Sequence, residues 1–597
     1  MAKSKYDNYT KEQLIYKINQ LEKQRYGLVW EDKEEAIAEQ CEKELPVLVE
    51  DKRKEIVCET NAPTHFIFEG DNYHTLYTLN FTHKKEVDVI YIDPPYNTGK
   101  TDKNGRTDFK YNDRFIKLDD KFRHSSWLSF INKRLRLAKY LLKQTGIVAI
   151  SIDDNEMCNL KLLCDKIFNE NNHIATVPTI MNLKGNQDQF GFAGTHEYTL
   201  FYAKNKSAAK IGEFDIDEEL EKEWLEDEIG LYKKGRALLA DGEGKYRKER
   251  PPMYFPLLVK DDKAYLITKE EHSKIYDKES NTFDDNFIEE LRKKYQKLGY
   301  EFVLPIDSQE SSLRWIWGFD EKFQTHLNDV IISKRKNGFS FYKKQRPKLG
   351  DAPSKKPKTT FYKPEYSSGN GTNQLKRLGL ENVFNNPKPI ELIKDILFIS
   401  GGKNALILDF FAGSGTTGQA VLELNKRDGG NRQFILCTNN ENNICEEVTY
   451  SRIKKVVEGY ADKKPIPANV KYFKTDFVPF VITDNNKRTL VSKSTELLCI
   501  AENTFAVIRQ NKHKQDFAIF KNVKHQTAII YDEDYIMDCC EELNKLKVKC
   551  KTVSYVFSYD HTYDEADFED LEVPFTVKPI PEAILNVYRK ISKLKKK

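Results

Sequence analysis

The sequence has few features of a secreted, membrane-bound or zinc-binding protein. Its ten cysteines show no CxxC spacing and no paired metal-ligand pattern, so we expect reduced thiols and no metal site. No window approaches the ~18 uninterrupted apolar residues of a membrane span, and the opening MAKSKYDNYTKEQ holds no apolar stretch of signal length. We therefore expect a cytoplasmic protein without a membrane partner.

An excess of charge of one sign is also missing. Lys plus Arg number 96 and Asp plus Glu number 92, so the formal net charge of +4 does not by itself indicate a nucleic-acid partner. Apolar material is plentiful, because 39% of the 597 residues are hydrophobic and 12% are aromatic. A large globular protein of roughly three to five compact units is expected.

Strand and helix patterns alternate in both halves of the chain. VDVIYI at 87–92 is an apolar run typical of a buried parallel strand, and it ends before Pro94. Helical spacing in SSWLSFINKRLRLAKYLLKQTG predicts a helix that stops at Gly146. PIELIKDILFIS, NALILDFFAGSGTTG and RQFILCTNNE predict a helix, a strand turning into a helix, and a strand. The alternation predicts an α/β fold with a parallel sheet.

The segment between the two halves differs in its charge. Residues 212–230 hold ten carboxylates and one lysine, for which a solvated helix face is the default expectation. Residues 331–363 hold eleven basic residues and one acidic residue, which is either an electrostatic footprint for a polyanion or a solvated loop. The candidate DNA contacts are Lys334, Arg335, Lys336, Lys343, Lys344 and Arg346. Interleaved aromatic residues, among them Phe341 and Phe361, can stack on bases or pack inside the domain.

A first chemical motif, Asp93-Pro94-Pro95-Tyr96, follows the strand at 87–92. The prolines fix the backbone, so the Asp93 carboxylate, the Pro94 carbonyl and the Tyr96 ring are held in a stiff arc. Two such acceptors can take hydrogen bonds from both N–H groups of an exocyclic amine and stabilise the positive charge that develops during attack. The alternative is a rigid turn without chemistry.

A second motif, at 409–418, reads DFFAGSGTTG. Its glycines let the backbone approach a ligand, and the following helix offers free N–H groups to a carboxylate or phosphate. A mononucleotide loop is disfavoured, because Gln419 and Ala420 follow Gly418 where Lys and Ser or Thr are needed. A dinucleotide, S-adenosyl-L-methionine and a turn that only packs a helix stay open. With S-adenosylmethionine, Asp409 would meet the ammonium and Glu441 the ribose.

The two motifs together resemble those of the amino-methylating DNA methyltransferases, which combine D-P-P-Y with F-x-G-x-G. Here D-P-P-Y comes first, the circularly permuted order of the β group, in which the target-recognition region lies between the halves. FEGDNYHTLYTL, DFKYND, VAISIDDNE, THEYTLFYAKN and FNNPKPIELI further resemble the modification (Mod) subunit of type III restriction–modification systems. The resemblance covers residues 26–470.

The resemblance implies methyl transfer from S-adenosyl-L-methionine to N6 of an adenine flipped out of double-stranded DNA, an adenine-specific DNA methyltransferase of the class EC 2.1.1.72. The implied catalytic residues are Asp93, Pro94, Pro95 and Tyr96. The implied cofactor residues are Asp409, Phe411, Ala412, Gly413, Gly415, Glu441, Lys388 and Asp71. Capping of the next helix is the alternative role of Asp71. The implied partners are a second copy of the chain, as a homodimer, and an ATP-dependent restriction (Res) subunit.

The resemblance also implies an order of domains. These are an N-terminal helical segment (1–55), a catalytic half (56–204), an inserted α+β target-recognition domain (205–370), a cofactor half (371–470) and a C-terminal α/β domain (471–597) for partner binding or dimerisation. The two halves would form one doubly wound Rossmann-like sheet. Alternatives are a catalytically silent DNA-recognition subunit, a solitary amino-methyltransferase, cytosine N4 as the target, and a nicotinamide-dependent oxidoreductase.

Overall fold

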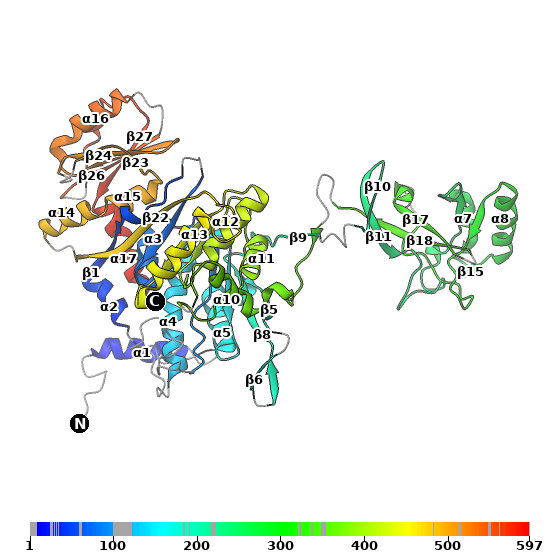
Figure 1. The fold of residues 1–597 in the computed structure, drawn as a ribbon. Coiled ribbons are helices and arrows are strands. Elements are labelled where there is room, and N and C mark those ends of the chain that lie inside the picture. Colours follow the sequence, from blue (N-terminus) through cyan, green and yellow to red (C-terminus); the bar gives the residue numbers. More distant parts are fainter. Residues whose placement is uncertain are drawn as a thin grey trace. The chain divides into compact units, whose positions relative to one another are not determined.

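The computed structural model describes the chain except at residues 1–8, 24–27, 29, 31–32, 34, 59–61, 100–121, 183–184, 190, 217–221, 320–322, 324, 336–337, 348–353, 382, 481–482, 512–514, 547–550, 560–561 and 596–597. The chain divides into two compact units (Figure 1). Unit 1 comprises residues 1–212 and 357–597, and unit 2 comprises residues 213–356. Within the described ranges, no helix is both long and apolar enough to cross a membrane.

A large mixed sheet forms the centre of unit 1. Its inner strands run parallel from β22 through β2, β21, β20 and β3 to β4, while β1, β8 and β5 add antiparallel pairs at the two edges. In sheet order the strands are β1 (Glu44–Glu50), β22 (Asn469–Pro479), β2 (Thr64–Glu69), β21 (Gln433–Thr438), β20 (Leu406–Asp409), β3 (Val87–Ile92), β4 (Leu142–Ile152), β8 (His196–Ala203) and β5 (His173–Ile180).

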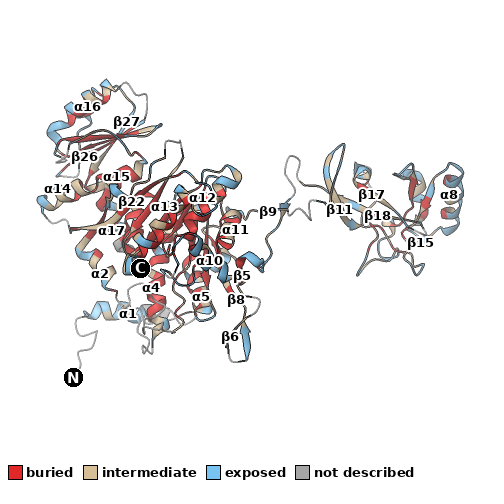
Figure 2. Ribbon diagram, in the orientation of Figure 1, coloured by how far each residue is buried: buried red, intermediate tan, exposed pale blue. Residues whose placement is uncertain are grey.

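Helices cover both faces of this sheet. Ile90 and Leu408 pack in one buried cluster with Leu76 and Leu135 from the helices of one face. Leu436 points the other way, because a Cβ on Gly418 of α12 would lie 2.9 Å from its Cδ1. The first group of helices is α3 (Asn72–Thr82), α4 (Arg123–Leu141) and α5 (Met157–Phe168), and the second is α11 (Ile390–Ser400), α12 (Thr416–Asp428) and α13 (Ser451–Glu458). Buried residues fill the strands and the helix sides that face them (Figure 2).

A second sheet belongs to the same unit and lies near its C-terminus. It consists of β23 (Ala506–Gln510), β24 (Phe517–Lys521), β25 (His525–Ile530), β26 (Lys551–Phe557) and β27 (Phe575–Ile580), with α14 (Asp484–Lys493), α15 (Thr495–Glu502), α16 (Ile536–Lys545) and α17 (Glu582–Lys595). Helix α17 packs on α3 of the large sheet, where Tyr588 Oη donates to Pro46 O at 2.7 Å. The two sheets therefore share one core.

One boundary predicted from the sequence falls inside a strand of the large sheet, and one segment predicted to be helical contains another of its strands. The boundary between residues 470 and 471 lies within β22, and the helical segment 1–55 contains β1 beside α1 (Lys11–Lys23) and α2 (Ala36–Lys43). The two misplaced segments are partners, because β1 pairs with β22 along its whole length. Such a pairing between opposite ends of the chain leaves no local signal in the sequence.

Unit 2 has its own core and several small sheets. Leu257, Trp315 and Phe341 are buried there in one hydrophobic cluster. One sheet has four strands, in the order β10 (Trp224–Asp227), β11 (Gly230–Ala237), β18 (Gly338–Gln345) and β17 (Val330–Arg335), and a second has three, in the order β13 (Lys263–Leu266), β12 (Leu257–Lys260) and β16 (Glu301–Val303). Two further sheets have two strands each: β9 (Phe214–Asp215) with β19 (Ser354–Lys355), and β14 (Tyr276–Asp277) with β15 (Thr282–Phe283). The helices of this unit include α7 (Lys269–Ile275) and α8 (Asp285–Lys297).

Two local predictions were wrong. The acidic segment 212–230 contributes strands β9 and β10 in its described parts, not a helix face. Helix α4 ends at Leu141 and leads directly into β4, so Gly146 lies inside a strand and does not stop the helix. A Cβ at Gly146 would lie 3.1 Å from Val87 O, so the glycine allows close approach of the neighbouring strand.

Candidate functional site

The D-P-P-Y loop leaves the carboxyl end of β3 and is fixed on both sides. Trp127 of α4, which is fully buried, donates from Nε1 to Pro95 O at 2.7 Å. Asn97 has a positive φ of 56° and donates from Nδ2 to Glu156 Oε1 at 2.5 Å. The loop around Asp93 is therefore rigid because of contacts beyond its two prolines.

Lys388, which lies just before α11, places its ammonium against this loop. Its Nζ lies 3.2 Å from Asp93 Oδ1 and 2.9 Å from Glu197 Oε2, and it donates to Tyr96 Oη at 2.5 Å. Tyr96 Oη in turn donates to Glu197 Oε2 at 3.2 Å. Three of the predicted residues thus form one cluster with Glu197, a residue of β8 that the sequence analysis did not assign.

Burial sets the electrostatics of the cluster. Burial would lower the pKa of Lys388, but the carboxylates of Asp93 and Glu197 outweigh it and the net direction is upward. Burial raises the pKa of Glu197, against the pull of Lys388, and it raises the pKa of Tyr96, with Asp93 and Glu197 adding to the effect. Lys388 therefore stays an ammonium and Tyr96 a neutral phenol at ordinary pH.

Two buried carboxylate oxygens in the cluster have no hydrogen-bond partner among the described residues. They are Asp93 Oδ1, which faces Lys388 at ion-pair distance only, and Glu197 Oε1. An unpaired buried acceptor costs free energy unless a ligand donates to it. Asp93 Oδ1 thus has the property that an acceptor for a substrate N–H needs.

The second motif forms a tight loop between β20 and α12. Gly413 and Gly415 have φ of +49° and +74°, which favours glycine at both positions. Gly415 N donates to Ala412 O at 2.7 Å, and Thr449 Oγ1 donates to Gly413 O at 2.6 Å. A Cβ at Gly413 would lie 3.0 Å from Phe384 Cζ. The loop therefore has room for backbone only.

Asp409 ends β20 and organises this loop. It is 2% exposed, and its carboxylate accepts from Phe411 N at 3.0 Å and from Thr417 Oγ1 at 2.5 Å. Burial raises the pKa of Asp409 to about 7, and the charge of Asp93 contributes in the same direction. Its predicted contact with a cofactor ammonium stays a prediction.

The two motifs lie at the same edge of the sheet. Strand β20 pairs in parallel with β3, with Ile407 opposite Val89, so both motifs leave the carboxyl ends of neighbouring strands. Thr416 Oγ1, in the first turn of α12, donates to Lys388 O at 3.5 Å, while the Lys388 side chain contacts Asp93. One residue thus touches both motifs. Carboxyl ends of neighbouring parallel strands are where ligands bind in open α/β sheets.

Asp71 caps a helix, which was the alternative for this residue. Its carboxylate accepts from Tyr73 N at 2.7 Å and from Arg134 Nη2 at 3.1 Å. The neighbouring Asn72 donates from Nδ2 to Phe410 O at 3.0 Å and accepts from Arg134 Nε. The EGDN block therefore supports the backbone of the glycine loop, and a contact between Asp71 and a cofactor stays a prediction.

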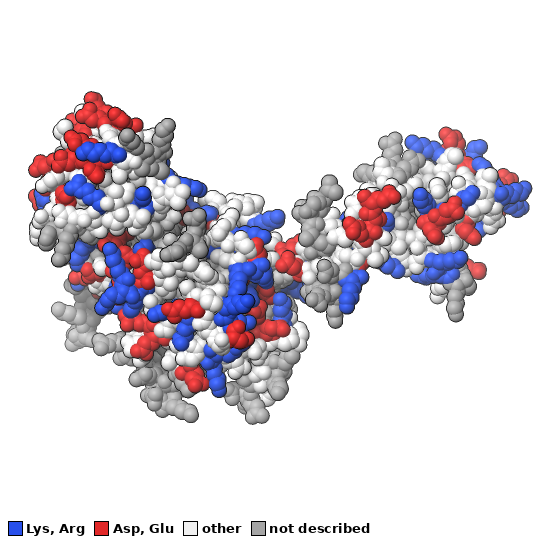
Figure 3. Space-filling view, turned by 45° about the horizontal axis from the view of Figure 1, so that its top comes forward, with Lys and Arg blue, Asp and Glu red and all other residues white. Residues whose placement is uncertain are grey.

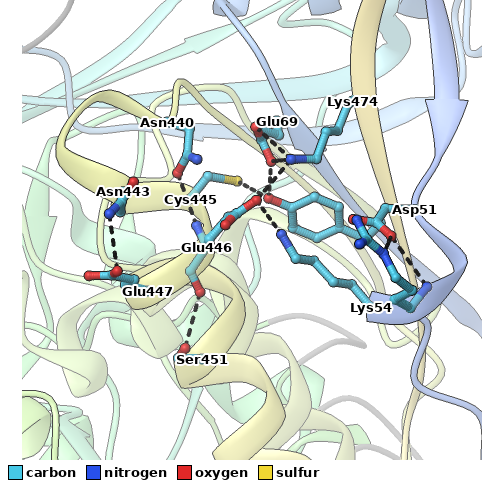
Figure 4. A network of polar contacts seen from close by, with 12 residues as sticks. Asp51, Lys54, Glu69, Asn440, Asn443, Cys445, Glu446, Glu447, Ser451 and Lys474 are labelled. Carbon is cyan, nitrogen blue, oxygen red and sulfur yellow. Dashed lines mark hydrogen bonds and ion pairs between the residues drawn. The ribbon is translucent and has the colours of Figure 1, made fainter.

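Glu441 is half-buried in a short turn after β21. Asn440, Asn443 and Glu446 of the same segment belong to a network of polar contacts (Figure 4). Glu446 lies at the centre of this network: its carboxylate pairs with Lys54 and, at 2.8 Å, with Lys474, and its N–H donates to Asn440 Oδ1 at 3.2 Å. The two lysines lower the pKa of Glu446 to about 2. The network fixes the segment that follows β21, and the predicted ribose contact of Glu441 stays a prediction.

Two of the predicted DNA contacts in unit 2 are already engaged in ion pairs. Asp227 pairs with Lys344 at 2.5 Å and with Arg346 at 2.6 Å, and Arg346 also pairs with Asp329 at 2.7 Å. The hydrogen bond from Arg346 and then that from Lys344 lower the pKa of Asp227. Acidic and basic side chains lie intermixed on the face of this unit in Figure 3. Exposed basic residues of the set are Lys334, Arg335 and Lys343, while Lys336 lies outside the described residues.

Two of the aromatic residues considered for base stacking pack inside the protein. Phe341 is 3% exposed and meets Trp315 edge to face in the core of unit 2, with ring centroids 5.6 Å apart. Phe361 is 4% exposed in unit 1. Core packing was the alternative for these side chains, and it holds for both.

Known proteins are similar to this chain over most of its length. Residues 87–450 match the model of the DNA methylase family. The chain is 41% identical to the type III restriction-modification enzyme EcoPI Mod subunit of Escherichia phage P1, over 71% of this chain and 65% of that protein. It is 31% identical to the type II methyltransferase M.KpnI of Klebsiella pneumoniae, over 67% of this chain and 89% of that protein.

A second Mod subunit and a solved structure extend the comparison. The StyLTI Mod subunit of Salmonella typhimurium is 31% identical over 70% of this chain and 59% of its own length. The chain thus matches less than two thirds of the length of both Mod subunits. The crystal structure of the M1.HpyAVI–SAM complex aligns with a TM-score of 0.27 and 13% identity, over 65% of this chain and 96% of that chain.

Proposed function

Because this chain belongs to the DNA methylase family, we propose that it transfers a methyl group from S-adenosyl-L-methionine to N6 of adenine in double-stranded DNA. The observation that carries the proposal is the contact of Lys388 with both motifs, which joins the D-P-P-Y acceptor to the glycine loop. The Mod relatives support a role as the modification and specificity subunit of a type III restriction–modification system. We place this activity in the cytoplasm.

The proposed cofactor and the proposed acceptor base each fit one feature of the site. The glycine loop leaves room for backbone only and precedes the N-terminus of α12, which suits a small ligand with an acidic end. Asp93 Oδ1 accepts no hydrogen bond from a described residue and therefore suits the amine of the acceptor base. Phe411, Ala412, Gly413 and Gly415 would line the cofactor site, with Asp409 and Glu441 at its two ends. In this reading the strands follow the permuted order of a Rossmann-like methyltransferase sheet.

In the proposed mechanism the cofactor supplies an activated methyl group on sulfur. Asp93 and the Pro94 carbonyl accept hydrogen bonds from the two N–H groups of the flipped adenine, which turns the nitrogen lone pair toward the methyl carbon. Tyr96 stacks on the base and repays part of the few kcal/mol that flipping costs. Transfer of the methyl group to N6 would release S-adenosylhomocysteine, and Asp93 would accept the proton that N6 loses. The ion pair with the Lys388 ammonium would hold the Asp93 carboxylate in position before the transfer.

Unit 2 would recognise the DNA sequence, with phosphate contacts from Lys334, Arg335 and Lys343. A homodimer and an ATP-dependent restriction subunit are the proposed protein partners. A solitary methyltransferase is the second candidate, because the match to M.KpnI covers 89% of that protein.

The test is a transfer assay with the purified full chain, labelled S-adenosylmethionine and mixed-sequence DNA, followed by mapping of the methylated positions. We expect label in N6-methyladenine at one short recurring sequence. Absence of transfer under all DNA and buffer conditions would contradict the proposal. Label on cytosine N4 would support methyl transfer to an exocyclic amine but would show that the target base is cytosine and not adenine.

A further inference from the structure

Arg452 of α13 is a buried cation directly behind the glycine loop. It is 0% exposed. Its Nη1 donates to Thr416 Oγ1 at 2.7 Å and to Ser414 Oγ at 3.2 Å, and its Nε donates to Gln419 Oε1 at 2.8 Å. Its Nη2 has no hydrogen-bond partner within the part of the chain that the structure describes. All of its partners are neutral.

This arrangement differs from that of the other fully buried arginines. Arg134 pairs with Glu35 at 2.9 Å, and Arg432 pairs with Asp428 at 2.8 Å. Arg452 forms no ion pair with a described residue, and burial lowers its pKa to about 10 although Tyr460 and Glu423 act in the other direction. A buried charge without a partner is costly, so its place behind a ligand loop calls for a function.

The contacts of Arg452 turn two hydroxyls into donors. A guanidinium has only donors, so Ser414 Oγ and Thr416 Oγ1 accept from it. The two hydroxyls also hydrogen-bond each other at 3.0 Å, so one of their two hydrogens is used between them and the other can point to a further acceptor. In the present structure Thr416 Oγ1 donates to Lys388 O over a long 3.5 Å. A stronger acceptor than this carbonyl would displace that bond.

The same turn is the N-terminus of α12, a helix of 13 residues whose N-cap, Gly415, provides no side-chain cap. Its first N–H groups and the helix dipole favour an anion there. A helix end, two oriented hydroxyls and a buried cation thus converge on one turn. The part of the proposed cofactor that matches this chemistry is its carboxylate.

We infer that Arg452 is a positioning residue for the carboxylate of the cofactor's methionine moiety, acting through the hydroxyls of Ser414 and Thr416 and through its charge behind the first turn of α12. The inference rests on the proposed function, because it names the group of S-adenosylmethionine that this turn recognises. Arg452 itself need not touch the cofactor.

The test compares two ligands on the full chain by titration calorimetry. S-adenosylmethionine carries the carboxylate, and decarboxylated S-adenosylmethionine keeps the adenosine, the sulfonium and the amine but lacks it. In Arg452→Met we expect Kd for S-adenosylmethionine to rise by about tenfold or more, as for loss of a charge-assisted contact. Kd for the decarboxylated ligand should change by less than about twofold. Arg452→Lys, which keeps the charge, should recover part of the loss.

Equal weakening of both ligands would show that Arg452 only holds the loop in shape, and unchanged binding of S-adenosylmethionine would show no role; either result overturns the inference. If Arg452→Met does not fold, the double variant Ser414→Ala with Thr416→Val decides, because it keeps the cation and removes both oriented hydroxyls. The same selective loss is expected, and an equal loss or none overturns the inference. Failure of the wild-type chain to bind S-adenosylmethionine would instead overturn the proposed function.

Discussion

Lys388 Nζ lies 3.2 Å from Asp93 Oδ1, so an ammonium from the segment just before α11 reaches the acidic residue of the D-P-P-Y loop. The same ammonium is shared with Glu197 at 2.9 Å. Two carboxylates share one ammonium, and Asp93 Oδ1 accepts no hydrogen bond from any residue that the structure describes. The balance between the two acids therefore decides how well Asp93 can accept from a substrate.

Replacing Glu197 should shift that balance. Glu197→Gln still accepts from Tyr96 and Lys388 but removes the competing charge, so the ammonium turns fully to Asp93 and competes with the substrate amine. We expect kcat to fall by about ten- to a hundredfold, in the range of a lost electrostatic contribution. KM for S-adenosylmethionine should change less than about twofold.

Steady-state transfer of a labelled methyl group measures both constants. A matched control is Glu391→Gln, which also removes a carboxylate paired with a lysine, Lys394 at 2.7 Å, but on the partly exposed side of α11. The control should retain kcat. Wild-type kcat in Glu197→Gln would refute the shared-ammonium account.

Gly413 and Gly429 offer a matched pair for the glycine loop. Both have positive φ, +49° and +66°, so alanine costs about 1 kcal/mol of backbone strain at either position. A new Cβ at Gly413 would lie 3.0 Å from Phe384 Cζ, whereas at Gly429 it meets nothing within 4 Å. We expect Gly413→Ala to weaken S-adenosylmethionine binding by at least about tenfold, and Gly429→Ala to lower only the stability. Equal Kd values in isothermal titration of the two variants would contradict a ligand role for this loop.

The site could be predicted to the extent that its chemistry lies in contiguous residues. Asp93, Tyr96 and the glycines of 413–415 stand in short motifs whose side chains and backbone geometry are local properties. Strand β3 and helix α12 also follow from local hydrophobic patterns. A capping box is a local pattern of the same kind: at the start of α1, Thr10 and Gln13 exchange hydrogen bonds of 2.9 and 3.2 Å.

The residues that were missed act across long separations in the chain. Glu197 stands in THEYTLFYAKN, a block that showed a resemblance but no chemical role, and only the pairing of β8 with β4 brings it near Asp93. Arg452 lies in a helix with no motif. The ion pairs of Lys344 and Arg346 with Asp227 were also invisible, because the carboxylate comes from β10 and the cations from β18 and the residues just after it. Counting charges along the sequence could not reveal this neutralisation.

Asp409 should make stability depend on pH. Its folded pKa of about 7 lies above the ordinary value of 3.8, so its favourable contribution is complete below pH ~4 and is lost as the pH rises through 7. The difference between these two pKa values corresponds to roughly 4 kcal/mol in the free energy of unfolding. Asp409→Asn keeps an acceptor for Phe411 N–H without titrating, so the stability of wild type relative to this variant should fall from pH 4 to 8. Calorimetric unfolding across this range measures the difference, and a constant difference would contradict the assignment.

The salt dependence of DNA binding should separate the basic residues of unit 2 into two classes. Neutralising the exposed Lys334, Arg335 and Lys343 together should reduce the slope of log Kd against log salt by about 2 to 3, at about 0.9 for each phosphate contact. Lys344→Ala should leave the slope unchanged and lower stability by about 1 kcal/mol, because its charge serves Asp227. Fluorescence anisotropy with duplex DNA at several salt concentrations gives the slopes. The prediction would be wrong if Lys344→Ala reduced the slope of log Kd against log salt and the triple variant did not.

The central claim is that Asp93 accepts the amine that receives the methyl group, in a site shared with the glycine loop. Single-turnover transfer by Asp93→Ala, with S-adenosylmethionine binding measured on the same preparation, tests it most directly. The account predicts a rate at least about a thousandfold below wild type, with Kd for S-adenosylmethionine within about threefold. Methylation at a near-normal rate by this variant would contradict the account.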